Sequence, residues 1–567
     1  MPANARRVLR AVDVYSGIGG WALGLRMAGI RVVASYELWG AANETNVKNN
    51  HHSAQTVDIR RLSLADLPED IDIVVGSPPC TEFSYSNRGG SGDIKNGLKD
   101  IIKFFTVVDY LKPKLWAMEN VPRVAEILES ELKRGGVLSK FSRLGISHRV
   151  FNMEDFGLPQ RRKRCIAGNF DFDLLASYSN SCPRLTLGHV VKALGARRIK
   201  DPIYGLRVSK VDFRDHLAEE LLTEEEERIN RCGKLMHPVY NSMAFPDSLE
   251  RPVRTLTATC TRVSRESIII EAPEKPGKFR RLTVRERACL QGFPITFQFY
   301  GSSYSAKLKM IGNAIPPLFT FFVGQAFQRT TERSLKGAAD GIKKFKMPTP
   351  VSQSTPPCRG RGRFPWTRSF RFAIPSLRLK SGVRCELKNI AKGGALKWEM
   401  ALVFGSPSSI HEMVLREESS AQFVSRIPKG SNELVRAELA AIGDFVRDAD
   451  VRRMQDLWSR RGPGSIRPFM MIDRIDRSAA KLVQLLINHR DIAEIIVKES
   501  IRTEFGTEVT KIAGVGKLTK HAPVTVAALI ITSVVNHALD SHGTQVAPEL
   551  RGRFPRREMR PFCRLLA

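Results

Sequence analysis

A short apolar run that ends in a double-proline turn constrains the fold of this chain most. Residues 71–75 read Ile-Asp-Ile-Val-Val, which predicts a buried parallel strand. Gly76 and Ser77 follow, and then Pro78 and Pro79 force a sharp turn before Cys80. Open α/β sheets bind ligands at the carboxyl ends of their strands. A free cysteine is more often buried and inert, but this turn predicts a thiol at a ligand site.

Strand-type and helix-type segments alternate along the first part of the chain. Apolar residues recur at helical spacing over 101–111, and a second helix is predicted after the glycine-rich turn 16–20, with Gly29 closing it. This alternation predicts an α/β fold with a doubly wound, mostly parallel sheet. The predicted strands cover residues 8–14, 31–36, 71–75 and 114–118, with a short third unit over 57–59.

A large positive charge is the main feature of the composition. The chain has a formal charge of +31 over 567 residues, which indicates a polyanionic partner, most simply nucleic acid. Its nine cysteines include no Cys-x-x-Cys pair. We therefore expect neither a metal site nor a disulfide framework, and a reducing compartment.

No segment predicts insertion into a membrane. The first ten residues are basic but lack the apolar centre of a signal peptide. The longest apolar stretch, residues 524–535, is too short to span a bilayer as a helix. We therefore expect a soluble cytoplasmic protein that has no membrane partner.

Six ordered motifs carry a resemblance to a known family. These six motifs, which include the Pro-Pro-Cys turn, make the sequence similar to the cytosine-5 DNA methyltransferases over residues 11 to about 330. The resemblance implies the class I fold of S-adenosylmethionine-dependent methyltransferases. The motifs are Asp13-Val14-Tyr15-Ser16-Gly17-Ile18-Gly19-Gly20, the turn at residues 76–84, Glu119-Asn120-Val121-Pro122, Pro159-Gln160-Arg161-Arg162-Lys163-Arg164, the run Arg285 to Pro294, and Gly312-Asn313-Ala314-Ile315-Pro316-Pro317.

The resemblance assigns four catalytic residues. Cys80 would supply a thiolate that adds to carbon 6 of cytosine and activates carbon 5 for methylation. Glu119 would meet ring nitrogen 3. Alternate residues of an extended segment project to one side, so Arg162 and Arg164 can converge on one base. Arg164 would contact the carbonyl oxygen of the base, and Arg162 would support the cysteine side or bind a phosphate.

The methyl donor implied by the resemblance is S-adenosylmethionine. Its site would include Glu37, at the end of the second strand, for the ribose hydroxyls, Asp58 for the adenine amine, and Tyr15 stacked on the ring. Glycines at 17, 19 and 20 would let the backbone approach the ligand. The full set of expected cofactor contacts is Asp13, Tyr15, Gly17, Gly19, Gly20, Glu37, Asp58, Pro78 and Asn313.

The remaining segments suggest a division into domains. Because the target carbon lies inside the base stack, the cytosine must be flipped out of the duplex. We expect a catalytic domain in two parts, residues 1–169 and 282–338, around a target-recognition domain, residues 170–281. There, Thr223 and Glu226 predict a helical capping box whose acids form a solvated first turn. A basic Pro/Gly-rich linker, 339–364, precedes an α+β accessory domain, 365–567.

The favoured function is a DNA cytosine-5 methyltransferase of a restriction-modification system. Its partner would be double-stranded DNA, bound as a monomer, with a cognate restriction endonuclease in the same system. The source would be a bacterium or phage, and the protein would lie in the cytoplasm with the nucleoid. Two alternatives stay open: a tRNA cytosine-5 methyltransferase, whose motifs barely differ, and a DNA-binding regulator. The target sequence follows no readable code.

Overall fold

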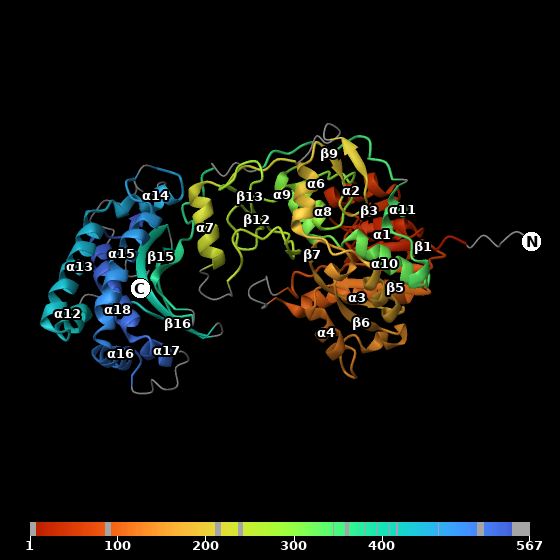
Figure 1. Ribbon diagram of the computed structural model, residues 1–567. Coiled ribbons are helices and arrows are strands. Elements are labelled where there is room, and N and C mark those ends of the chain that lie inside the picture. Colours follow the sequence, from red (N-terminus) through yellow and green to blue (C-terminus); the bar gives the residue numbers. More distant parts are fainter. Residues whose placement is uncertain are drawn as a thin grey trace, which may run out of the picture. The chain divides into compact units, whose positions relative to one another are not determined.

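The chain folds into two compact units (Figure 1). The first contains residues 1–230 and 244–360, and the second contains residues 231–243 and 361–567. All predicted site residues belong to the first unit. The limits proposed above for the catalytic, target-recognition and accessory domains remain predictions. The computed structural model describes residues 7–546 except 85–91, 210–216, 236–241, 344, 358–361, 380–381, 393, 407–408, 416–417, 463 and 507–514.

A seven-stranded sheet forms the centre of the first unit. Its order is β3-β2-β1-β4-β5-β8-β6, and the strands from β3 to β5 run parallel. Strand β8 is antiparallel to both of its neighbours. The predicted doubly wound, mostly parallel sheet is therefore confirmed. The strands are β1 (Arg10–Val14), β2 (Arg31–Glu37), β3 (Ser53–Thr56), β4 (Ile73–Gly76), β5 (Leu115–Asn120), β6 (Ser147–Asn152) and β8 (Lys163–Gly168).

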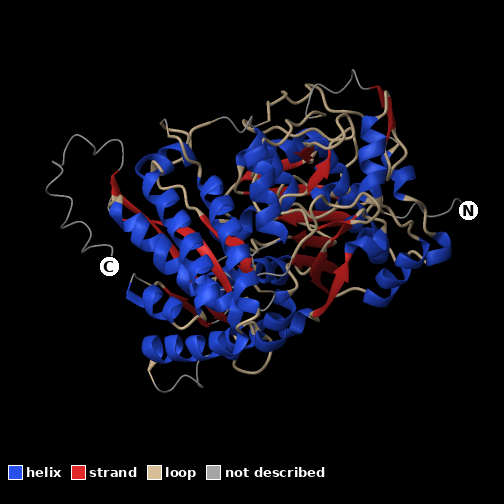
Figure 2. Cartoon of the chain, turned by 60° about the vertical axis from the view of Figure 1, so that its left-hand side comes forward, coloured by secondary structure: helices blue, strands red, loops and turns tan. Residues whose placement is uncertain are grey.

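Two apolar layers cover the two faces of this sheet, because successive strand residues point to opposite sides. Val75 belongs to the layer of α1 (Gly20–Met27) and α10 (Pro317–Phe327), and Val74 to the layer of α3 (Ile94–Leu111). In the second layer, Phe105 lies edge-on to Trp116 of β5, with ring centroids 5.5 Å apart. Figure 2 shows the helices of the chain in blue and its strands in red. Burial on both faces explains the apolar runs of the central strands.

Two predicted elements differ in their limits. Helix α3 begins seven residues before the predicted start, because Asp93 caps it by accepting from the Asn96 N–H at 3.0 Å. Its first turns are polar, so apolar periodicity could not find them. The predicted third unit at 57–59 is wrong by a few residues. The strand there is β3, and Asp58 instead caps the short 3-10 turn Ile59–Arg61.

Several short elements complete the sheet-bearing part of the unit. Among them, α5 packs into the same core as α1 and α10 through Phe172 and Leu175. The others lie at the sheet margins or after α10. These elements are α2 (Gly40–Asn50), α4 (Arg123–Glu131), β7 (Gln160–Arg161), α5 (Phe172–Ser177) and α11 (Ala338–Ile342).

A smaller part of the first unit has its own apolar core, which includes Leu187, Ile268, Ile270 and Leu290. This core is joined to the catalytic segment by strand pairing, because β11 runs parallel to β7. The elements of this part are α6 (Leu187–Gly195), β9 (Arg198–Lys200), β10 (Arg207–Ser209), β11 (Val253–Arg254), β12 (Ile269–Glu271), β13 (Phe279–Arg281) and α8 (Val284–Leu290). Helix α7 (Glu224–Leu235) begins in the first unit, and its residues from 231 on are grouped with the second unit. Helix α9 (Tyr304–Asn313) packs into the core that contains α1 and α10.

The first turn of α7 confirms one prediction and corrects another. The Glu226 N–H donates to Thr223 Oγ1 at 3.3 Å, and the Thr223 N–H donates to Glu226 Oε2 at 2.9 Å, which forms the predicted capping box. However, the Glu226 side chain is 2% exposed and pairs with Arg262 at 2.8 Å. The prediction of a fully solvated acidic turn was therefore wrong for Glu226.

The segment predicted as a flexible linker is partly bound to the first unit. The Phe345 ring stacks under the Arg26 guanidinium, 3.8 Å from the ring centroid. Farther along, the Ser352 hydroxyl donates to Gln298 Oε1 at 2.8 Å, and Lys307 Nζ donates to the Gln353 carbonyl. Ser352 is 2% exposed. Residues 345–353, called the strap below, therefore belong to the packed fold.

The second unit combines an antiparallel sheet with helices, which confirms the predicted α+β fold. The sheet order is β14-β15-β16-β17, with β18 paired to β16. Asn536 of α18 bonds the backbone of Met400 on β16, at 2.7 Å to its N–H and 2.9 Å to its carbonyl. The elements are β14 (Arg371–Arg378), β15 (Arg384–Lys392), β16 (Ala395–Ser406), β17 (Ser409–Met413), α12 (Glu418–Ser425), α13 (Lys429–Asp448), α14 (Met454–Trp458), α15 (Pro468–Ile487), α16 (Arg490–Phe505), α17 (Val515–Lys520), α18 (Ala522–Ser541) and β18 (Gln545–Val546).

Two helical stretches of the described chain are long and apolar enough to cross a membrane by length and composition. They are Tyr304–Phe327, which joins α9 and α10, and Ala522–Ser541. The second corrects the predicted length, because the apolar stretch at 524–535 lies within a helix of 20 residues. The apolar windows of the two stretches are 89% and 78% buried inside the protein.

Candidate active site

The Pro-Pro-Cys turn follows β4 directly and is fixed by a neighbouring strand. Asn120, the last residue of β5, donates from Nδ2 to the Pro78 carbonyl at 3.1 Å. The Cys80 carbonyl accepts from the N–H groups of Phe83 and Ser84, both at 3.0 Å, which forms a tight turn after the cysteine. Cys80 keeps partial exposure. A rigid turn therefore presents its thiol at the carboxyl edge of the sheet.

Glu119 and Arg164 form an ion pair beside this thiol. Arg164 Nε lies 2.8 Å from Glu119 Oε1, and the two side chains are 12% and 8% exposed. They meet because β8 pairs antiparallel with β5. Burial is the main reason that the pKa of the Cys80 thiol is raised, and the negative charge of Glu119 adds to this increase. The positive charges of Arg164 and Arg162 lower the pKa, but by less, so the net change is an increase. The thiol, the carboxylate and two guanidinium groups are thus electrostatically coupled.

Arg162 is buried, whereas the adjacent residues Arg161 and Lys163 are exposed. Its guanidinium, 1% exposed, donates to the carbonyls of Leu256, Gly312 and Ala314 at 3.3, 3.2 and 3.1 Å. A phosphate contact, one of the two roles predicted for Arg162, is therefore wrong, because the group is enclosed by backbone. Arg161 and Lys163 are exposed, as the alternation predicts.

Gln160 and Gln291 connect three separate motifs. Gln160 Nε2 donates to Gln291 Oε1 at 2.7 Å, and Gln160 Oε1 accepts from the Leu256 N–H at 2.9 Å. Gln291 Nε2 in turn donates to the Ala314 carbonyl. Both glutamines are fully buried. Together with Arg162 they fix the backbone around the catalytic pocket.

The glycine-rich turn after β1 contains features typical of a ligand cradle. Glu37 accepts from the N–H groups of Gly17 at 2.9 Å and Trp39 at 2.8 Å. Gly17 has a φ of +53°, and a Cβ there would meet nothing within 4 Å, so the space beside it is open. Asp13 is buried, and neither carboxylate oxygen makes a hydrogen bond in the described structure. Burial, and then Glu37, raise the pKa of Asp13.

Two of the glycines in this turn are required by packing. A Cβ on Gly19 would lie 2.0 Å from Asn46 Oδ1, and one on Gly20 would lie 2.1 Å from the Ile315 carbonyl oxygen. Neither approach involves a ligand. Close packing within the protein therefore explains Gly19 and Gly20 without a ligand, which competes with the prediction that they admit the methyl donor. The open space beside Gly17 agrees with that prediction.

Helix α2 supports this turn with asparagines that sequence reasoning missed. Asn50 Nδ2 donates to the Gly19 carbonyl at 3.2 Å and to Asn46 Oδ1 at 2.8 Å. Asn46 Nδ2 donates to Ser16 Oγ at 3.4 Å. The spacing of Asn43, Asn46 and Asn50 places them on one helical face, which was the available signal.

The other expected cofactor residues lie in different surroundings. The Tyr15 hydroxyl donates to Asp100 Oδ1 at 3.1 Å, and only 8% of the residue is exposed. Asp58 is partly exposed and Pro78 is buried within the turn. Asn313 is exposed at the end of α9. Among the described residues, no group of three or more His, Cys, Asp or Glu side chains could hold a metal ion.

The arrangement of these motifs agrees with the comparison of the chain with known proteins. Residues 9–329 match the family model described as C-5 cytosine-specific DNA methylase. The chain belongs to this family. The match starts just before β1 and ends just after α10, so it contains all six motifs and leaves residues 361–567 of the second unit outside.

Individual members of the C-5 cytosine-specific DNA methylase family align over most of their own length. The type II methyltransferase M.FnuDI of Fusobacterium nucleatum is 25% identical over 57% of this chain and 95% of its own. M.NgoPII of Neisseria gonorrhoeae is 28% identical over 57% of this chain and 97% of its own. The solved structure of S. pombe Dnmt2 aligns with 57% of this chain and 98% of its own, at 19% identity and a TM-score of 0.39.

Proposed function

We propose that the protein transfers a methyl group from S-adenosylmethionine to carbon 5 of a cytosine in double-stranded DNA, through a covalent adduct with Cys80. One observation carries this proposal: a partly exposed thiol on a fixed turn lies beside the Glu119–Arg164 ion pair. Family membership supplies the reaction class.

The catalytic side chains have distinct roles in this proposal. The Cys80 thiolate forms a bond to carbon 6, and the displaced ring electrons are neutralised at nitrogen 3 by a proton from Glu119. Carbon 5 then takes the methyl group. Water or another solvent base then removes the carbon 5 proton, and the bond between carbon 6 and sulfur breaks to release the Cys80 thiolate. Nitrogen 3 returns its proton to Glu119, which restores the aromatic ring. Arg164, held by Glu119, contacts the base carbonyl, and Arg162 supports Cys80 from beneath.

The residues around the glycine-rich turn fit a bound S-adenosylmethionine, which would supply an electrophilic methyl group. A buried acid with few hydrogen bonds is costly, and Asp13 of β1 is such a group: its oxygens make no close hydrogen bond, although the Ala22 backbone lowers its pKa. Open space beside Gly17 adds room for the ligand. The Glu37 carboxylate would accept hydrogen bonds from the ribose hydroxyls, and the Asp58 carboxylate would accept one from the adenine amine. Pro78 and Asn313 would close the site. Tyr15 would contact the donor through its small exposed edge.

The proposed action on DNA rests on membership of the family and on the large positive charge of the chain. The cytosine must leave the stack to reach Cys80, and the charge of +31 favours a phosphate backbone as partner. Two of the relatives named above, M.FnuDI and M.NgoPII, are type II methyltransferases of bacteria. We propose that this protein likewise modifies DNA in a restriction-modification system, as a cytoplasmic, nucleoid-associated monomer with a cognate endonuclease.

A trapping experiment tests the chemistry. Duplex DNA containing 5-fluorocytosine should form a stable adduct with the wild-type protein, because the fluorine cannot leave as a proton would. Cys80→Ser should form none while still binding S-adenosylmethionine. An adduct with the serine variant would show that Cys80 is not the nucleophile. Parallel reactions with a tRNA pool decide the substrate, and methylation of RNA alone would overturn the DNA assignment.

A further inference from the structure

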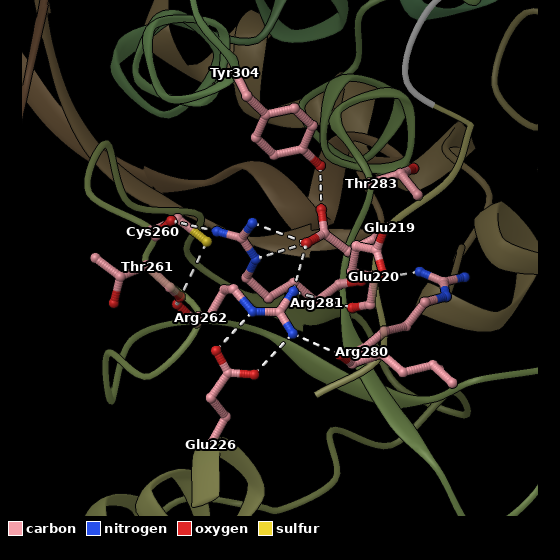
Figure 3. Close-up of polar contacts among 12 residues, drawn as sticks. Glu219, Glu220, Glu226, Cys260, Thr261, Arg262, Arg280, Arg281, Thr283 and Tyr304 are labelled. Carbon is pink, nitrogen blue, oxygen red and sulfur yellow. Dashed lines mark hydrogen bonds and ion pairs between the residues drawn. The ribbon is translucent and has the colours of Figure 1, made fainter. Parts of the chain in front are cut away.

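A buried ion-pair cluster lies outside the catalytic pocket, and Figure 3 shows it centred on Glu219. The Glu219 side chain is 0% exposed. Its Oε1 accepts from Arg281 at 3.1 Å (Nε) and 2.8 Å (Nη2), and from Arg262 Nη1 at 3.4 Å. Its Oε2 accepts from the Tyr304 hydroxyl. Arg262 also makes two bonds of 2.8 Å to Glu226. These five residues are called the Glu219 cluster.

The cluster holds one end of a loop whose other end is held by the catalytic site. At the start of loop 256–262, the Leu256 carbonyl accepts from Arg162 Nη1 at 3.3 Å. Near its end, the Cys260 carbonyl accepts from Arg281 Nη1 at 2.8 Å, and Arg262 is itself a cluster member. The loop therefore runs from Arg162, which interacts electrostatically with Cys80, to the Glu219 cluster.

Between these two anchors the loop presents polar side chains to solvent. Thr259 and Thr261 are exposed, and the Thr257 hydroxyl donates to the Thr259 carbonyl at 2.7 Å. The backbone between the anchors is thus a fixed polar turn. Hydroxyl groups of this kind can bond base edges and phosphate oxygens.

Stability alone explains such a cluster poorly. Buried ion pairs often stabilise a fold less than apolar residues of the same volume, because both charges lose their hydration. The Glu219 cluster removes two arginines, two glutamates and a tyrosine hydroxyl from water. The distinctive consequence of the cluster is geometric. The Glu219 carboxylate fixes Arg281, which donates to the Cys260 carbonyl, and also Arg262, which ends the loop.

We infer that Glu219 is a positioning residue for DNA recognition, which holds loop 256–262 where Thr259 and Thr261 meet the duplex next to the flipped cytosine. The inference rests on the proposed function, since it needs DNA as the substrate. Glu219 is not among the residues assigned above to the base or to the methyl donor. Its loss should therefore affect the use of DNA and leave donor binding intact.

The test uses three substitutions in the full-length protein. Glu219→Gln keeps the shape and removes the charge, and Tyr304→Phe removes the hydroxyl that donates to Glu219 Oε2. The matched control is Glu386→Gln, another fully buried glutamate paired with two arginines, Arg371 and Arg384, in the second unit. Each variant is assayed for kcat and KM with duplex DNA, for the Kd of S-adenosylmethionine, for melting temperature, and for amide exchange across loop 256–262.

Glu219→Gln should lower kcat/KM for DNA at least tenfold, mainly through KM, and relax the choice of sites seen by bisulfite sequencing. Amide exchange should accelerate in the loop, and the donor Kd should change less than twofold. Tyr304→Phe should shift the same quantities less, which keeps the test valid if Glu219→Gln fails to fold. Glu386→Gln should leave DNA KM unchanged.

Two results would overturn the inference. One is unchanged DNA kinetics with Glu219→Gln, and the other is an equal loss of donor binding, which indicates general destabilisation. Failure of the proposed function looks different, because the wild-type protein would then not methylate DNA at all. Amide exchange still reports whether Glu219 holds the loop in that case.

Discussion

At the scale of single residues, the site combines groups that raise and lower the reactivity of one thiol. Burial is the largest influence on Cys80, and it raises the pKa, whereas Arg164 is the largest opposing influence. The thiolate is the nucleophilic form of cysteine. The raised pKa therefore favours the protonated thiol in the free enzyme.

The pH dependence of alkylation follows from this balance. The reaction of Cys80 with iodoacetamide should accelerate as pH rises, with a midpoint above that of an ordinary cysteine, because the raised pKa delays ionisation. Arg164→Gln should move the midpoint higher, and the exposed Arg161→Gln should not. Mass spectrometry of the Cys80 peptide gives the rates. A midpoint below that of free cysteine would contradict the direction of the shift.

Glu37 has two tasks in the proposed donor site. Its carboxylate accepts hydrogen bonds from the N–H groups of Gly17 and Trp39, and it would also accept hydrogen bonds from the ribose hydroxyls. Glu37→Ala should raise the Kd of S-adenosylmethionine at least tenfold, since a hydrogen bond to a charged group contributes about 1.5–3 kcal/mol. The exposed Glu44→Ala is the control. Calorimetry measures both, and an unchanged Kd for Glu37→Ala would remove it from the site.

At the scale of elements, the sequence predicted several strands and helices that bury apolar side chains, and it missed α2, whose buried face is polar. It also missed the apolar helix α10. The strands around residues 71–75 and 114–118 are apolar runs, and both are present as β4 and β5. Helix α2 was not predicted because its buried face consists largely of asparagines. The same reasoning missed the pairing of Glu226, because only the fold brings Arg262 to it. Catalytic motifs were found through resemblance, whereas the Glu219 cluster has no local signal.

Helix α2 should influence donor binding through its asparagines. Asn46→Ala removes the bonds to Ser16 and Asn50 that brace the glycine-rich turn. Unpaired buried polar groups cost about 1–3 kcal/mol, so the variant should melt earlier and bind S-adenosylmethionine several-fold more weakly. Asn96→Ala, near the exposed start of α3, is a comparison outside the turn. Equal donor affinity for the wild type and Asn46→Ala would show that α2 is only a scaffold.

At the scale of the whole molecule, the methylase match and the compact first unit end at different residues. The family match stops at residue 329, but the first unit continues to residue 360. The strap accounts for part of the difference, because Phe345, Ser352 and Gln353 all contact this unit. Composition predicted a tether there, since Lys, Pro and Ser give no apolar pattern. Specific partners, which composition does not reveal, bind the strap to the fold.

Truncation separates the strap from the second unit. A protein ending at residue 357 should fold and methylate DNA, because it keeps the six motifs and the strap. One ending at residue 338 loses the contacts of Arg26, Gln298 and Lys307, and it should melt several degrees lower. Both should show a flatter dependence of DNA affinity on salt than the full chain, because each lacks the basic residues beyond 357. Calorimetry and binding at several salt concentrations measure these effects. If the protein ending at 357 is folded and binds the methyl donor but transfers no methyl group, the second unit belongs to the catalytic machinery.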